Sequence, residues 1–103
     1  MSERISREEL VRIYQIEVSF FDQLEESGLL RTETADNVKY LTEENLPALE
    51  RYANLYYDLD INIPGIEVID RLMKKIETLQ QENRNMFARL AQLHADWEDA
   101  DFL

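Results

Sequence analysis

Apolar residues recur most regularly between residues 69 and 97, at alternating intervals of three and four. In a heptad lettered a to g, they fill positions a and d. Such a stripe stays on one side of a helix for roughly 43 Å at about 1.5 Å per residue, so we expect a partner helix to cover it. The predicted homodimer seam consists of Ile69, Ile76, Asn83, Leu90 and Trp97 at a and of Leu72, Leu79, Met86 and Leu93 at d.

Two short helices are predicted nearer the N-terminus. The first covers residues 6–14, because Ser6 and Glu9 form a capping box at its start. The second covers residues 17–26 and ends before Gly28, the residue type that most readily turns the chain out of a helix. The residues expected to face the core are Leu10, Ile13 and Tyr14 in the first helix and Val18, Phe21 and Leu24 in the second.

The middle of the chain predicts a hairpin and a third helix. Residues 29–41 contain the turn-prone pair Asp36-Asn37 between two short pieces suited to strands. Thr42 is a good N-cap for a helix over residues 43–59, and Pro64 opens the long helix after a break. The third helix is expected to turn Leu46, Leu49, Ala53 and Tyr56 inward. The fold class is therefore mainly α, with one domain at 1–60 and a long helix with a short acidic tail at 61–103.

The charge balance narrows the class of partner. The chain carries 11 basic and 22 acidic residues, for a net charge of −11, and no segment is basic. Proteins that hold nucleic acid neutralise phosphates with Lys and Arg, and helices that lie on membranes need a cationic face. Both partners are disfavoured, and a basic protein is the natural complement. The alternative is that the acidic surface only keeps a small protein soluble.

Candidate chemistry is sparse. The chain has no cysteine, and no nucleophile triad, phosphate loop or metal-ligand spacing occurs, so we predict no enzyme activity, no cofactor and no metal. His94 is expected to flank the seam. Of the three tyrosines Tyr52, Tyr56 and Tyr57, two are expected in the core and one exposed. The N-terminus does not have the apolar run of a signal peptide, so a cytoplasmic location is expected.

Several segments carry a family resemblance. The residues from Ile5-Ser6-Arg7-Glu8-Glu9-Leu10 to Gly28-Leu29-Leu30 resemble the winged helix-turn-helix of MerR-type regulators. Within that superfamily, residues 59–66 (Leu-Asp-Ile-Asn-Ile-Pro-Gly-Ile) and 79–84 (Leu-Gln-Gln-Glu-Asn-Arg) resemble the chaperone-modulator branch, CbpM. The resemblance implies a winged helix-turn-helix at 1–60 and a modulator that binds the J-domain of a DnaJ-like (CbpA-type) co-chaperone and inhibits its action on Hsp70.

The charges of the second helix can be compared with those of a DNA-reading helix in the MerR family. A DNA-reading helix needs arginine or lysine, yet residues 15–30 contain neither. The wing offers Arg31 and Lys39 against Glu33 and Asp36. J-domains present a basic helix to Hsp70, and an acidic helix can compete for it. The expected partner-binding residues are Glu17, Phe20, Asp22, Glu25 and Glu26, with Phe20 as an apolar anchor.

Two alternatives stay open at this point. The chain can instead be a MerR-like DNA-binding transcriptional regulator with an unusually acidic reading helix. In the seam, Ile at a, Leu at d and the single Asn83 favour two parallel helices, whereas MerR relatives pair their long helices antiparallel. We follow the family and expect the antiparallel direction.

Overall fold

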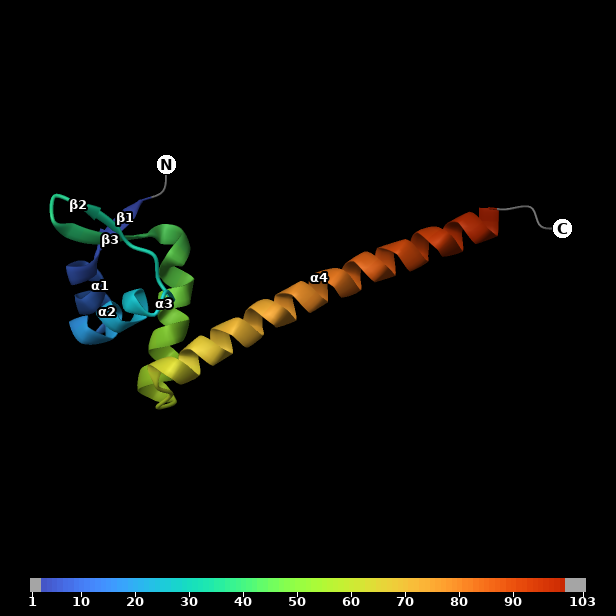
Figure 1. Ribbon diagram of the computed structural model, residues 1–103. Helices are drawn as coiled ribbons and strands as arrows, with labels where there is room; N and C mark the ends of the chain where they lie inside the picture. Colours follow the sequence, from blue (N-terminus) through green and yellow to red (C-terminus); the bar gives the residue numbers. More distant parts are fainter. Residues whose placement is uncertain (1–2, 100–103) are drawn as a thin grey trace. The chain divides into compact units, whose positions relative to one another are not determined.

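A computed structural model describes residues 3–99 of the chain (Figure 1). The elements follow in the order β1, α1, α2, β2, β3, η1, α3, η2 and α4. Packing separates one compact unit that ends at Asp70 from a second unit that begins at Arg71. The predicted mainly helical fold, with a small sheet and a long C-terminal helix, is confirmed.

The helix-turn-helix consists of α1 (Arg7–Tyr14) and α2 (Val18–Glu26). The predicted cap of α1 is present, because the Ser6 hydroxyl accepts a hydrogen bond from the N–H of Glu9 at 3.2 Å. Between the helices, Gln15 adopts a left-handed φ of 54°. This residue ends α1 and turns the chain into α2.

The end of α2 is closed by a glycine, as predicted. Gly28 has a φ of 81°. The following amides of Leu29 and Leu30 both donate to the carbonyl oxygen of Leu24, at 2.9 and 3.3 Å. A carbonyl of the last turn is thereby paired although the helix has ended.

A small antiparallel sheet forms the wing. The predicted hairpin consists of β2 (Glu33–Ala35) and β3 (Val38–Thr42), joined by Asp36 and Asn37 with φ values of 51° and 64°. Two consecutive left-handed residues are typical of the tightest hairpin turns. A third strand, β1 (Arg4–Ser6), pairs with the other edge of β3, so the strand order is β1-β3-β2. The sequence did not predict β1, because three residues are too few to show a period.

The helix predicted for residues 43–59 is a run of three helix types. A 3₁₀ turn η1 (Glu43–Asn45) leads into α3 (Leu46–Ala53), and a π-helical turn η2 (Asn54–Asp58) follows. Thr42 stands at the N-cap, but its side chain makes no capping bond to a backbone amide. The prediction of one α-helix was therefore wrong in detail, because apolar periodicity does not distinguish these helix types over a single turn.

The core lies where α1, α2 and α3 meet the sheet and the start of α4. Two residues predicted to face inward do not, since Ile13 and Val18 are 59% and 42% exposed. Each helix advances about 100° per residue, and the buried side of α1 includes Val11 and that of α2 includes Phe20, which turns Ile13 and Val18 outward. The buried apolar residues are Leu10, Ile16, Phe20, Phe21, Leu24, Leu30, Leu41, Leu49, Tyr52 and Ile66.

The long helix α4 (Ile63–Asp99) begins one residue before Pro64, and Asn62 caps it. The Asn62 side-chain oxygen accepts a hydrogen bond from the N–H of Gly65 at 2.9 Å. Ile66 is fully buried, and the Tyr52 hydroxyl donates to Asp70 at 2.9 Å. The first turns of α4 therefore belong to the compact unit, although the domain boundary was expected at residues 60 and 61.

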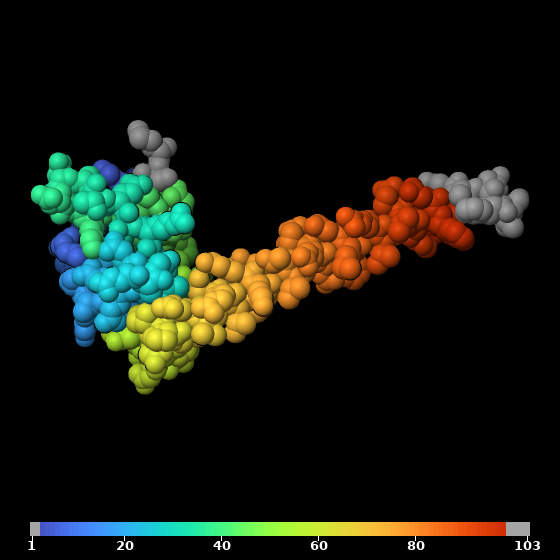
Figure 2. All heavy atoms as spheres, viewed as in Figure 1, coloured from blue at the N-terminus to red at the C-terminus, as the bar shows by residue number. Residues whose placement is uncertain are grey.

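From Arg71 onward, α4 is a unit by itself. Figure 2 shows the side chains of this stretch arranged around a single helix axis. Every residue from 74 to 98 is exposed. The acidic tail at residues 100–103 lies outside the described residues.

Candidate partner-binding surfaces

The sequence suggested that the carboxylates of α2 form a free acidic face. In the structure, two of them are paired with bases from other elements. Asp22 accepts a hydrogen bond from the guanidinium of Arg7 at 2.9 Å, and the ammonium of Lys39 lies 4.0 Å away. Glu25 accepts hydrogen bonds from Lys39 and from the hydroxyl of Thr32. Both carboxylates are therefore paired within the domain, because α1 and β3 supply bases that the sequence of α2 does not contain.

The electrostatics of this network follow from its contacts. The hydrogen bond from Lys39, with that from Thr32, lowers the pKa of Glu25. The same bond raises the pKa of Lys39. Hydrogen bonds to Glu8 and Asp22 raise the pKa of Arg7. Glu25, Lys39 and Arg7 therefore stay charged near neutral pH, and the network ties α1, α2 and the wing together.

Phe20 is a core residue and not an anchor for a partner. Its side chain is 1% exposed. Its ring lies 4.5 Å from the ring of Tyr56 and 5.2 Å from that of Tyr57, between centroids. The helical periodicity predicted that only Phe21 of the adjacent pair Phe20-Phe21 would be buried. Both are buried, because the apolar side of α2 is wider than a single stripe.

Two of the expected partner-binding residues remain at the surface. Glu17 and Glu26 are exposed and stand at the two ends of α2. Glu17 accepts a hydrogen bond from the Ser19 hydroxyl at 3.3 Å. On α1, Glu8 and Glu9 are exposed as well, so carboxylates from both helices reach solvent.

The tyrosines of α3 and η2 are buried and exposed as predicted. Tyr52 is 3% exposed, Tyr56 is half-buried and Tyr57 is 38% exposed. His94, expected beside the seam, is exposed and lies 3.0 Å from Glu98 in the next turn of α4.

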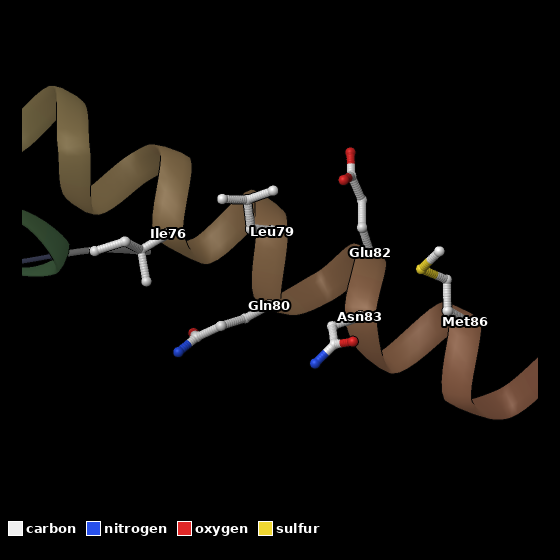
Figure 3. Close-up of a pocket in the computed structure, with 6 residues that line it drawn as sticks. All are labelled: Ile76, Leu79, Gln80, Glu82, Asn83 and Met86. Atoms are coloured by element: carbon white, nitrogen blue, oxygen red, sulfur yellow. The ribbon is translucent and has the colours of Figure 1, made fainter.

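The predicted seam is an exposed apolar stripe. Its members between residues 72 and 97, apart from Asn83, are 52–69% exposed, and Ile69 is half-buried. A shallow hollow of about 430 Å³ lies on this stripe and is lined by side chains of α4 alone. Leu79, Asn83 and Met86 are among the lining residues labelled in Figure 3. Continuous apolar surface of this kind is uncommon on monomers and marks interaction sites.

Two apolar residues that the heptad did not include broaden the stripe. Val68 and Phe87 are 49% and 66% exposed. They occupy positions g and e, which flank a coiled-coil seam. The sequence signal for them is an apolar residue at a position that flanks a and d.

Metal-binding clusters and membrane-spanning helices were sought in the part of the chain that the structure describes. Within residues 3–99, no group of three or more His, Cys, Asp or Glu side chains is arranged to hold a metal ion. No helix of that stretch is both long and apolar enough to cross a bilayer.

Comparison with known proteins agrees with this architecture. Residues 5–87 match the family described as MerR HTH family regulatory protein. The match covers the helix-turn-helix, the wing, α3 and more than half of α4. No curated protein and no solved structure matches the chain. Since the match spans most of its length, the chain belongs to the MerR family of helix-turn-helix regulatory proteins.

Proposed function

We propose that the protein is a non-enzymatic modulator that binds the J-domain of a DnaJ-like (CbpA-type) co-chaperone and thereby limits the action of that co-chaperone on Hsp70. The observation that carries the proposal is the chemistry of α2, the helix that in this architecture is placed to read a partner. It contains no Arg or Lys, and the two bases that reach it, Arg7 and Lys39, are bound to Asp22 and Glu25.

Charge makes a basic protein surface a better partner than DNA. Residues 7–26 carry six carboxylates against the guanidinium groups of Arg7 and Arg12. A duplex would meet this surface with like charge, and it would lack the phosphate contacts that supply most of the affinity for DNA. A basic helix of a J-domain meets it with opposite charge, which speeds encounter and selects the partner.

The surface proposed for binding differs from the one read off the sequence. Glu17 and Glu26 keep their role, joined by Glu8 and Glu9 of α1. Asp22 and Glu25 act through their ion pairs with Arg7 and Lys39, which join α2 to α1 and β3. Phe20 supports α2 from inside.

The test is the rate of association with a purified J-domain. The variant Glu17→Lys with Glu26→Lys changes the charge by four units at exposed positions, so it is expected to slow association at least tenfold at low salt. The matched control, Glu3→Lys with Glu77→Lys, makes the same charge change at exposed positions on β1's N-terminal side and on α4. Biolayer interferometry at two salt concentrations measures both.

The control separates a local effect from that of net charge. If both variants slow association equally, the effect is general and α2 is not the binding surface. If the wild-type protein does not bind J-domains at all, the proposed function is wrong.

A second candidate is a MerR-like transcriptional regulator, which the formed wing favours. Arg31 on the exposed approach to β2 is a base that can reach a phosphate. A mobility-shift assay at low salt is the most permissive test, because counterion release then favours association most. We expect no sequence-specific complex, and a nanomolar complex at physiological salt would establish the second candidate instead.

We further propose that the protein acts as a homodimer whose α4 helices pair along the exposed stripe. A second copy is the proposed occupant because the stripe keeps heptad spacing, which is typical of helices that pair with helices. Burying leucine-sized side chains contributes roughly 1.5–3 kcal/mol each. The pairing thus removes from water the largest apolar surface of α4.

The charges beside the stripe favour the antiparallel direction and one register. Position g holds Lys75, Glu82, Arg89 and Asp96, which alternate in sign and are all exposed. In an antiparallel pair, g residues face g residues of the partner. A register that sets Leu79 opposite Leu90 of the partner subunit also sets Lys75 opposite Asp96 and Glu82 opposite Arg89, so that all four contacts are attractive.

Other arrangements lack this match. Shifting the antiparallel register by one heptad in either direction loses it: one shift sets Glu82 against Glu82 of the partner subunit, and the opposite shift sets Arg89 against Arg89 of the partner subunit. A parallel pair sets Glu82 near Phe87 of the partner subunit and forms no opposite-charge pair between g and e. It would offer only a contact between the two Asn83 side chains.

A further inference from the structure

A hollow of about 330 Å³ opens at the surface of the compact unit, beside the π-helical turn. It is lined by Tyr56, Tyr57, Asp60, Ile61 and Asn62. The proposed function does not use this hollow. Its walls combine two aromatic rings, an aliphatic side chain and a carboxylate.

The aromatic wall is rigid. The rings of Tyr56 and Tyr57 meet edge to face, with centroids 5.0 Å apart and an angle of 79° between their planes. Both rings also pack on buried Phe20. The Tyr57 hydroxyl accepts a hydrogen bond from the N–H of Glu17 at 2.9 Å. The rings are therefore held in place before any ligand arrives.

The carboxylate stands at a left-handed turn of the backbone. Asp60 has a φ of 56°, in the left-handed region that aspartate and asparagine enter more readily than other residues apart from glycine. The turn that contains Asp60 is held to η2 by a hydrogen bond of 2.9 Å from the N–H of Ile61 to the carbonyl oxygen of Leu55. Asp60 is exposed, and no cation of residues 3–99 forms an ion pair with it. Among the described residues, this exposed carboxylate is therefore left for a ligand.

We propose that this hollow binds the cationic end of a lysine or arginine side chain from the protein partner. Aromatic rings beside a carboxylate favour a cation, and Ile61 offers an apolar surface for the aliphatic stem. The inference rests on the proposed function in naming a basic protein as the source. The hollow lies next to the start of α2, since Tyr57 is bonded to the backbone of Glu17.

The first experiment uses the intact protein and a small probe. Aromatic NMR signals of Tyr56 and Tyr57 are followed while n-butylguanidinium is added, with n-butylurea as the neutral probe of similar shape. Saturating shifts with the cation and none with the urea are expected. An equal response to both probes, or no response to either, would overturn the proposal.

Asp60→Asn tests the carboxylate without disturbing the loop, because asparagine tolerates left-handed φ as well as aspartate does. We expect it to weaken n-butylguanidinium binding about fivefold, the size of a modest charge contact. Asp58→Asn is the matched control, since Asp58 is an exposed carboxylate that does not line the hollow. Circular dichroism verifies that both variants fold. Equal weakening by the two variants would show that only net charge matters and would contradict the site.

Binding of a J-domain separates this inference from the proposed function. Loss of affinity for both the probe and the J-domain in Asp60→Asn supports the full proposal. Selective probe binding by a protein that binds no J-domain leaves the hollow as a cation site and refutes the proposed function alone. J-domain binding that Asp60→Asn leaves unchanged would show that the partner does not use the hollow.

Discussion

The guanidinium of Arg7, at the start of α1, donates a hydrogen bond of 2.9 Å to the carboxylate of Asp22 in the middle of α2. With Lys39 and Glu25, this contact joins both helices of the helix-turn-helix to the wing. The acidic helix is thereby half neutralised from inside the domain. What remains for a partner is the carboxylates at its two ends.

The network predicts how stability depends on pH. The pKa of Glu25 is lowered from 4.5 by Lys39, so its contribution is fully present above the unfolded value and is lost as the pH falls through the folded value. Lys39→Met is expected to destabilise the protein at pH 7 and to flatten the loss of stability below pH 4.5. Urea unfolding at a series of pH values measures both effects. If Lys39→Met lost stability below pH 4.5 as steeply as the wild-type protein, Lys39 and Glu25 would form no stabilising contact.

The burial of Phe20 predicts that its loss affects folding and not partner contact. Phe20→Ala removes a ring that is 1% exposed, and it is expected to lower the free energy of unfolding by about 3–5 kcal/mol. Val18→Ala, on the exposed side of the same helix, should cost less than about 1 kcal/mol. Thermal unfolding followed by circular dichroism compares them. A fully stable Phe20→Ala that lost only binding would restore Phe20 as an anchor.

The apolar stripe predicts assembly in pairs. Sedimentation at micromolar concentration should give a dimer. Leu79→Asp with Leu90→Asp is expected to give monomers, because the two positions face one another in the proposed pair and an unpaired charge there is costly to bury. Ala88→Asp with Ala95→Asp adds the same charges at position f of the same helix, away from the seam, and should leave a dimer. A monomeric wild-type protein would refute the pairing.

The charges at position g predict the direction of pairing. Glu82→Lys sets like charges at two symmetric contacts of the antiparallel dimer and is expected to weaken dimerisation about tenfold at low salt. Adding Arg89→Glu to that variant exchanges the two signs and should restore the affinity. Sedimentation equilibrium measures the three proteins. A parallel dimer would respond weakly to Glu82→Lys and would not be rescued.

Local signals in the sequence determined most of the elements. Ser6, Gly28 and Asn62 place helix ends because their backbone and side-chain chemistry acts within a few residues. The turn at Asp36 and Asn37 follows from the same kind of preference. The heptad of α4 is equally local, since it repeats a spacing along one helix.

Only the tertiary structure decided which charges and rings reach the surface. Asp22 and Glu25 are neutralised by Arg7 and Lys39 across element boundaries, and Phe20 is covered by tyrosines that follow α3. Such contacts join residues far apart in the chain, so no period or cap in the sequence reports them. The strand β1 was missed for the same reason, because its three residues become a strand only by pairing with β3. The sequence by itself determined where the chain is helical, and folding determined which faces of those helices remain for a partner.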